Sequence, residues 1–214
     1  MHTNDGGRAG DLDAPARQSP GAALVAWDAE AVRASAELVA QVTPADLARP
    51  TPCAEWLLRD LLDHMTAQHR GFTAAAQGRT SLSPWRVRPE PDPVDAYQRA
   101  AAHVREVFAQ PGILQRRFLL PEIAADRAFP AVRAIGFHFL DYVVHSWDVA
   151  KAMGMTAEFA PDLLDAALAI AKEVPGGSTR LTPGAAFAPA LPGRGGGPLD
   201  TILTLLGRSP DWPH

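Results

Sequence analysis

Four ionisable side chains follow one face of a predicted helix in the second half of the chain. His138, Asp141, His145 and Asp148 lie within FHFLDYVVHSWDVA at steps of three, four and three residues. This is the spacing of the apolar seam between packed helices. Because burying unpaired charges is costly, such a stripe is tolerable only if a partner such as a divalent cation compensates it. The pattern therefore predicts a metal site inside a helical bundle.

A second predicted helix supplies another histidine at a core position. Its inward face consists of residues at steps of three and four: Leu57, Leu61, His64, Gln68 and Phe72. His64 is therefore expected to face the bundle interior. Asp141 and His145 lie one helical turn apart, where two side chains can share one ion. A structural Asp–His pair has the same spacing, and a hydrogen-bonded core histidine is the alternative for His64.

His64, Asp141 and His145 together offer an imidazole, a carboxylate and a second imidazole. This set suits Zn(II) or another divalent first-row ion and leaves room for water or substrate; nickel, iron and manganese stay open. A metal-bound imidazole usually hydrogen-bonds to an outer group through its other nitrogen, so His138 and Asp148 are expected to support the ligands, with a direct ligand role for either as the alternative. Asp148 is also a candidate general base, with capping of a helix end as its structural alternative.

Other polar residues have less support from spacing. Gln68, one turn beyond His64, either holds a metal-bound water or lines the bundle. Cys53 follows proline in an extended PTPC segment and is predicted to be a small packing residue rather than a nucleophile. His69 and His103 have no partner at a useful spacing and are predicted to be solvated.

Composition excludes several classes of function. The 214 residues carry a net charge of −4, which gives no electrostatic reason to bind nucleic acid. No apolar run reaches the ~20 residues of a membrane span. The single cysteine excludes an intramolecular disulfide, and the N-terminus lacks the pattern of a secretion signal, so a cytoplasmic location is expected.

Periodicity predicts an all-α fold in a single domain over residues 21–214, after a disordered tail over residues 1–20 that is rich in Gly, Asp, Pro and Arg. The helices are expected at about residues 24–42, 55–77, 94–110, 130–154, 161–174 and 199–206. The proline-rich residues 79–93 predict a long crossover. The Gly/Pro-rich residues 175–198 predict a long loop, with the one candidate hairpin of the chain, that could cover a pocket.

Three segments resemble a known family: TPCAEWLLRDLLDHMTAQ at 51–68, LDYVVHSWDVAKAMG at 140–154 and LTLLGRSPDW at 203–212. Their order and separation are similar to those of actinobacterial metal-binding proteins related to mycothiol-dependent maleylpyruvate isomerase, in the DinB-like superfamily. The resemblance spans about residues 24–212. It implies a DinB-like four-helix bundle whose metal is held by His64, Asp141 and His145. The isomerase has Glu in place of Asp141, and it carries a separate C-terminal domain that this chain is expected to lack.

The resemblance also implies a reaction class. Members with known activity bring a small thiol, mycothiol or bacillithiol, to a metal that lowers the thiol pKa, and the thiolate attacks an electrophile. We therefore predict a Zn(II)-dependent thiol transferase or isomerase that uses mycothiol and a small electrophilic substrate. A thiol-independent hydrolase or cyclase, a non-catalytic metal- or ligand-binding protein and a purely structural bundle remain alternatives. The oligomeric state is open between a monomer and a homodimer.

Overall fold

The computed structural model describes residues 19–53, 55–182, 186–193 and 195–213. The tail predicted for residues 1–20 lies outside this part of the chain except at its end. There the prediction is wrong, because Ser19 caps the first helix by accepting a hydrogen bond from the backbone N–H of Ala22, and Pro20 is the first helical residue. Proline fits this position because its fixed φ suits a helix and no hydrogen bond is lost.

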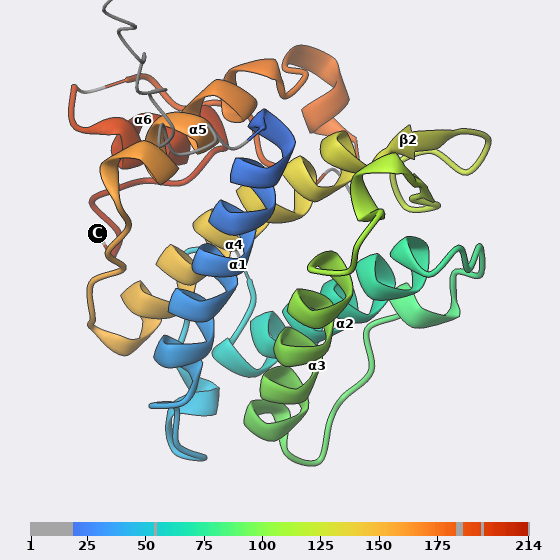
Figure 1. Cartoon of the computed structure of the whole chain (residues 1–214). Coiled ribbons are helices and arrows are strands. Elements are labelled where there is room, and N and C mark those ends of the chain that lie inside the picture. The colour runs from blue at the N-terminus through green and yellow to red at the C-terminus, as the bar shows by residue number, and fades with distance from the viewer. Residues whose placement is uncertain (1–18, 54, 183–185, 194, 214) are drawn as a thin grey trace, which may run out of the picture.

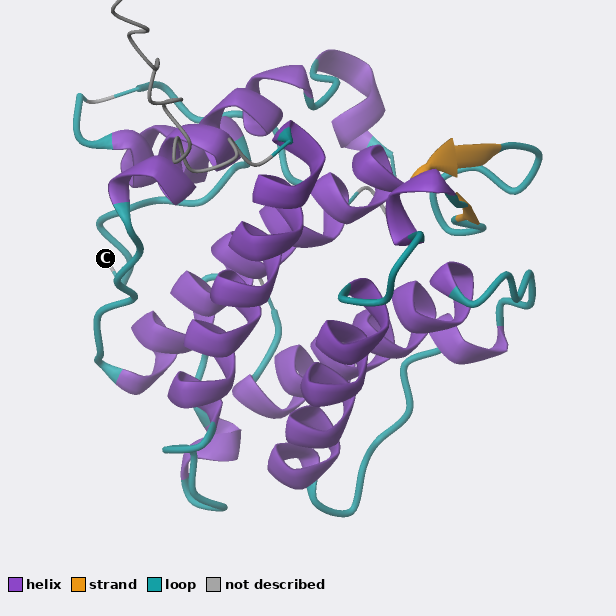
Figure 2. Cartoon of the chain, in the orientation of Figure 1, coloured by secondary structure: helices purple, strands orange, loops and turns teal. Residues whose placement is uncertain are grey.

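Four helices form a bundle (Figures 1 and 2). They are α1 (Pro20–Val39), α2 (Leu58–Ala76), α3 (Pro93–Phe108) and α4 (Ala131–Met153). Helix α1 packs mainly against α4, and α2 packs mainly against α3. Their apolar side chains form a continuous core, and a long crossover over residues 77–92 joins α2 to α3. The predicted all-α bundle with a long crossover is confirmed.

Two further helices follow the bundle. Helix α5 (Pro161–Glu173) packs against α4 and against the short helix α6 (Pro198–Leu205), as the upper left of Figure 1 shows. The long loop between them contains a 3₁₀ turn at Gly177–Leu181. Arg180 in this turn is buried and fastens the loop: its guanidinium donates to the backbone carbonyls of Val174, Pro175, Ala188 and Leu205. The role of this loop as a cover stays a prediction.

The start of α2 corrects a boundary predicted near Glu55. Glu55 has a φ of +67°, outside the right-handed helical region. The chain instead closes a loop in which Leu58 N–H donates to the carbonyl of Arg49, and the helix starts where the Asp60 carboxylate accepts the N–H of Leu57 at 3.0 Å. The end of α1 is likewise three residues earlier than the expected Val42.

The one candidate hairpin was placed within residues 175–198, and the described part of that segment contains no strand. The hairpin lies between α3 and α4, where β1 (Arg117–Leu119) pairs antiparallel with β2 (Ala128–Pro130). The opposed side chains of Phe118 and Phe129 are both buried and anchor it to the core. Strands of three residues are too short to show a period-two pattern in a sequence.

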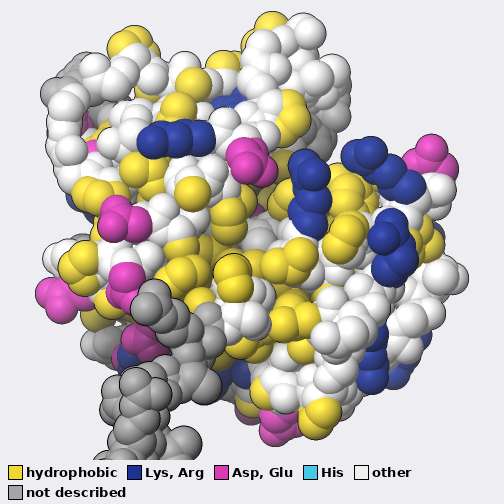
Figure 3. Space-filling view, turned by 45° about the horizontal axis from the view of Figure 1, so that its top comes forward, with side chains coloured by type: hydrophobic (Ala, Val, Ile, Leu, Met, Phe, Trp, Pro, Cys, Tyr) yellow, Lys and Arg dark blue, Asp and Glu magenta, His cyan; other side chains and the backbone are white. Residues whose placement is uncertain are grey.

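The surface near the hairpin mixes basic and apolar side chains. Arg127 lies over the ring of Phe129 at 5.0 Å, and Arg133 lies over the ring of Phe137 at 5.7 Å. Figure 3 shows a face of the molecule on which basic side chains gather to one side among apolar ones.

None of the helices in the described residues has both the length and the apolar character needed to cross a membrane.

Gly71 allows the crossover to pack closely on α2. A Cβ atom at this position would lie 2.2 Å from Cδ2 of Trp85, whose buried ring also contacts Phe72. Any larger residue at position 71 would displace this indole. Gly71 thus sets the distance between α2 and the crossover that leads to α3.

We expect Gly71→Ala to lower the free energy of unfolding by about 1–3 kcal/mol, the usual cost of overpacking a core. Urea unfolding followed by Trp fluorescence measures this change. Gly176→Ala is the matched control, because nothing lies within 4 Å of the added Cβ and its φ of −106° suits any residue. Equal stability of the two variants would contradict the packing argument.

Candidate metal centre

The structure brings together the three residues that spacing selected. His64 comes from α2, and Asp141 and His145 come from α4. One potential ligand atom from each lies within 4.8 Å of the others, and His145 Nε2 is 3.4 Å from Asp141 Oδ1. The rings of His64 and His145 meet edge to face with centroids 5.3 Å apart. His145 is buried, whereas His64 and Asp141 are partly accessible.

Asp148 supports His145 from one turn further along α4. Its Oδ2 lies 3.0 Å from His145 Nδ1, and the carboxylate has no exposure to solvent. When Nδ1–H donates to this carboxylate, Nε2 keeps its lone pair and faces Asp141. This is the arrangement in which histidine binds metals in proteins.

Arg208, directly after α6, pairs with the buried Asp148. Its Nε lies 3.0 Å from Asp148 Oδ1 and its Nη2 lies 3.1 Å from Oδ2, while Nη2 also donates to Cys53 Sγ at 3.2 Å. The cluster thus joins α4, the segment before α2 and the C-terminal segment. Charges buried in this way are tolerable because each one is paired and hydrogen-bonded.

These contacts move the pKa values of the cluster in different directions. Burial lowers the pKa of His64 to about 4, which keeps its imidazole neutral. Burial also disfavours the charged form of His145, but Asp141 and Asp148 outweigh it and raise the pKa of His145. Burial opposes ionisation of Asp148, yet the hydrogen bond from His145 and the charge of Arg208 lower the pKa of this carboxyl.

The donor set fits a divalent ion by both chemistry and spacing. Two ligand atoms that are each about 2.1 Å from a tetrahedral ion lie about 3.4 Å apart, which matches the separation of His145 Nε2 and Asp141 Oδ1. A neutral imidazole, an imidazole oriented by a carboxylate and a free carboxylate oxygen are suitable ligands for Zn(II) and its neighbours.

A cavity of about 270 Å³ opens beside His64. Trp56, Val87 and Pro89 supply its apolar wall, and Asp60 and Asp63 line it as well. The Trp56 ring contacts His64 with centroids 4.7 Å apart, and both residues line the cavity. A small molecule in the cavity would lie next to His64.

His138 and His69 belong to a different buried cluster. His138 Nδ1 lies 2.6 Å from Asp28 Oδ1 on α1, and His138 Nε2 lies 3.0 Å from His69 Nδ1 on α2. His69 is fully buried and stacks on Tyr142 with centroids 4.0 Å apart. The prediction that His69 is solvated is wrong. None of the contacts among the described residues links His138 to His64, Asp141 or His145.

The remaining candidates lie at the edges of the cluster or away from it. Gln68 donates to the Glu122 carboxylate at 3.0 Å, on the loop after β1. His103 is exposed on α3, as predicted. Cys53 is partly buried, and burial raises the pKa of its thiol to about 11, so it is not poised as a nucleophile at neutral pH.

Sequence reasoning did not assign Arg208 or Asp28 to a cluster. Arg208 lies in the terminal LTLLGRSPDW segment, which carried the family resemblance, and that segment was the available signal for it. Asp28 lies on the first helix at an ordinary position, 110 residues from its partner His138. No local pattern marks such a partner.

The fold and the cluster define a class: a helical bundle with a His/Asp/His group converging from two of its helices. Residues 28–150 match the family described as the mycothiol maleylpyruvate isomerase N-terminal domain. The chain belongs to this family. The predicted family relationship is therefore confirmed.

Relatives and solved structures agree with this assignment. Two uncharacterized proteins of Mycobacterium tuberculosis, MT0763 of strain CDC 1551 / Oshkosh and Rv0738 of strain ATCC 25618 / H37Rv, are each 36% identical over 82% of this chain and 92% of their own length. The crystal structure of the mycothiol-dependent maleylpyruvate isomerase aligns with a TM-score of 0.62 and 17% identity over 90% of this chain and 91% of the isomerase chain. A mutant of that enzyme aligns with a TM-score of 0.64 and 15% identity over 89% and 90%.

These structural alignments show a shared fold. They span nine tenths of the crystallised isomerase chain. The expectation that the isomerase carries a separate C-terminal domain missing here gains no support from these alignments, because about a tenth of that chain is left unmatched.

The buried His69 predicts how stability depends on pH. Burial, and then the nearby His138, hold the pKa of His69 well below its ordinary 6.5. Below about pH 6.5 the unfolded chain therefore binds a proton at His69, whereas the folded chain does not. The free energy of unfolding consequently falls as the pH drops, by up to about 1.4 kcal/mol per pH unit for this group.

Urea unfolding at pH 7, 6 and 5 measures this slope. His69→Gln keeps a donor for His138 but cannot titrate, so its slope should be smaller by up to about one proton. Because the comparison uses slopes, a lower absolute stability of the variant does not affect it. Identical slopes in both proteins would contradict the assignment.

The raised pKa of Cys53 predicts slow alkylation. With a pKa of about 11, the thiolate fraction at pH 8 is roughly a hundredfold below that of an unfolded cysteine. We expect iodoacetamide to label the folded protein at least that much more slowly than the urea-unfolded protein, as mass spectrometry would show. Equal rates in both states at pH 8 would overturn this description of the thiol.

Proposed function

We propose that His64, Asp141 and His145 hold a divalent metal ion, most simply Zn(II), and that the protein uses it to activate a small thiol against an electrophilic substrate. The convergence of the three ligand atoms within 4.8 Å is the observation that carries this proposal. Membership of the isomerase family supports mycothiol as the thiol. A bound divalent ion would supply positive charge that lowers the pKa of a thiol beside it.

The residues of the chain divide the remaining tasks. Asp148 orients His145 through Nδ1 and so directs Nε2 toward the ion. Asp148 itself is poorly placed as a general base, since His145 and Arg208 occupy both of its oxygens and lower its pKa. We therefore assign Asp148 a positioning role rather than the role of general base.

The cavity beside His64 is the proposed substrate site. Its volume of about 270 Å³ suits a small molecule, and the Trp56 ring offers a flat apolar surface next to the ligand cluster. In the proposed reaction the thiolate sulfur donates an electron pair to an unsaturated electrophilic carbon of this molecule, so that a C–S bond forms, the carbon–carbon π bond breaks, and the neighbouring carbon takes up a proton from solvent. A reducing cytoplasm, which keeps such thiols available, belongs to the same proposal.

Metal analysis of the purified protein tests the ligand assignment. We expect about one divalent ion per chain, and a loss of most of it in His64→Ala, Asp141→Ala and His145→Ala. Asp141→Glu should keep the ion because it keeps the carboxylate, and Asp148→Asn should weaken binding about 10–100-fold. His103→Ala, an exposed position away from the cluster, is the control.

Consumption of mycothiol with a panel of electrophiles, with and without a chelator, tests the reaction. Turnover that needs both thiol and metal supports the proposal. Turnover in thiol-free buffer would indicate a metal-dependent hydrolase or cyclase instead. A folded protein that binds no divalent ion in calorimetry would contradict the metal centre itself.

A further inference from the structure

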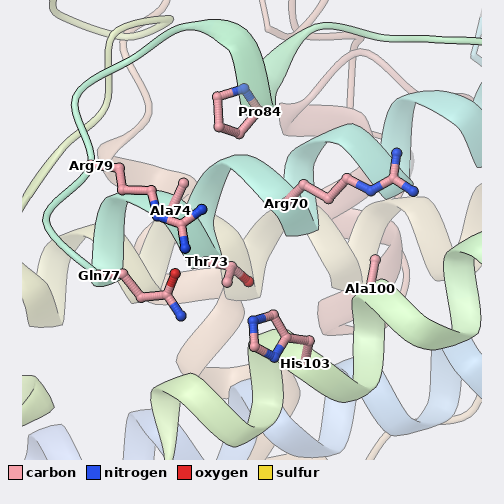
Figure 4. A pocket seen from close by; sticks show the side chains of 8 residues that line it. All are labelled: Arg70, Thr73, Ala74, Gln77, Arg79, Pro84, Ala100 and His103. Atoms are coloured by element: carbon pink, nitrogen blue, oxygen red, sulfur yellow. The ribbon is translucent and has the colours of Figure 1, made fainter.

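A second cavity, of about 260 Å³, lies between α2, α3 and the crossover. Its polar lining consists of Arg70, Thr73, Gln77, Arg79 and His103, with Pro84 of the crossover closing one side (Figure 4). It shares no lining residue with the cavity beside His64. Thr73 lies nine residues beyond His64 on the same helix, which is about 14 Å along its axis.

The two arginines of this cavity differ in their partners. Arg70 forms an ion pair with Glu90, and in Figure 4 its guanidinium points away from the other polar side chains. Arg79 extends along the end of α2 beside Gln77 and Thr73. Among the described residues, no hydrogen bond or ion pair involves the Arg79 guanidinium; only its backbone N–H is bonded, to the carbonyl of Ala74. Its charge is therefore available to a ligand.

The hydroxyl of Thr73 is a second free donor. The residue is 6% exposed, and its Oγ1 is buried without a hydrogen-bond partner in the described part of the chain. Buried polar groups are normally satisfied, so an unpartnered hydroxyl on a residue that lines a cavity is a donor that a turn of the side chain would offer to a ligand there. The Gln77 amide and the His103 ring lie on either side of it (Figure 4).

We propose that this cavity is a binding site for a small oxyanion, a carboxylate or phosphate group. Arg79 would supply the charge and a forked pair of N–H donors, and Thr73, Gln77 and the N–H of His103 would complete the shell. Guanidinium groups bind both kinds of oxyanion through two parallel hydrogen bonds. Two acidic side chains contact residues of this lining: Glu90 pairs with Arg70, and Glu106 Oε2 lies 3.7 Å from His103 Nδ1, while neither of them pairs with Arg79.

Binding of inorganic phosphate and of acetate to the full chain tests this site, by NMR titration of the arginine and glutamine side-chain N–H signals at constant ionic strength. We expect saturable shifts at Arg79 and Gln77 with one of the two ions. Arg79→Gln should weaken binding about tenfold or more. Arg105→Gln on exposed α3 surface removes the same charge outside the cavity and should change the affinity by less than about twofold.

A pair of substitutions at Thr73 separates the hydroxyl from the shape of the side chain. Thr73→Ser should retain most of the affinity, whereas the nearly isosteric Thr73→Val should lose several-fold. Tighter phosphate binding identifies a phosphate-type ligand, and tighter acetate binding identifies a carboxylate. Shifts that do not saturate, or equal affinities in the Arg79 and Arg105 variants, would overturn the proposal. None of these results depends on metal binding at His64.

Discussion

The ion pair between Asp148 and Arg208 holds the candidate metal centre together. Asp148 is completely buried in α4, and Arg208 reaches it from beyond α6 through contacts of 3.0 and 3.1 Å. Removing one partner of such a pair costs about 3–5 kcal/mol, because the other charge is left buried alone. Oδ2 of the same carboxylate also orients His145, and the same guanidinium contacts Cys53. Three segments that are distant in sequence therefore meet at one ion pair.

Two histidines on the same face of α4 have different environments. His138 and His145 are seven residues, or about two turns, apart. His138 is enclosed between α1 and α2, where Asp28 and His69 occupy both of its ring nitrogens. His145 has one nitrogen occupied by Asp148, and its other nitrogen lies 3.4 Å from Oδ1 of the partly accessible Asp141. Only the second arrangement leaves a lone pair free for a ligand.

Local geometry explains which parts of this structure were predictable. The positions of Asp141 and His145 follow from the rigid spacing of one helix, and His64 could be added because α2 has a clear periodic face. His69 was misjudged because α2 is buried on more than one side: besides its contacts with α3 it contacts α4, and its alanine-rich end is buried almost completely. A single apolar stripe describes a helix with one buried face, so it fails for such a helix.

Long-range partners were beyond the reach of the sequence pattern. Arg208 is 60 residues from Asp148, and Asp28 is 110 residues from His138. Neither distance is reflected in a period or a motif spacing. The hairpin was missed for a different reason, since its stability comes from two buried phenylalanines rather than from an alternating strand pattern.

The crossover contributes to both cavities and is held firmly between them. Pro84 closes one cavity, while Val87 and Pro89 form a wall of the other. Trp85, next to Pro84, packs into the space that Gly71 leaves. Glu90, next to Pro89, is bound by three residues of α2: Arg59 donates to its backbone carbonyl, Asp63 accepts its backbone N–H, and Arg70 pairs with its carboxylate. These anchors fix the crossover to α2 at two separate places. A ligand that binds in one cavity therefore contacts a rigid segment and does not shift the crossover at the other cavity. The two sites should therefore fill independently, although one continuous stretch of chain lines them both.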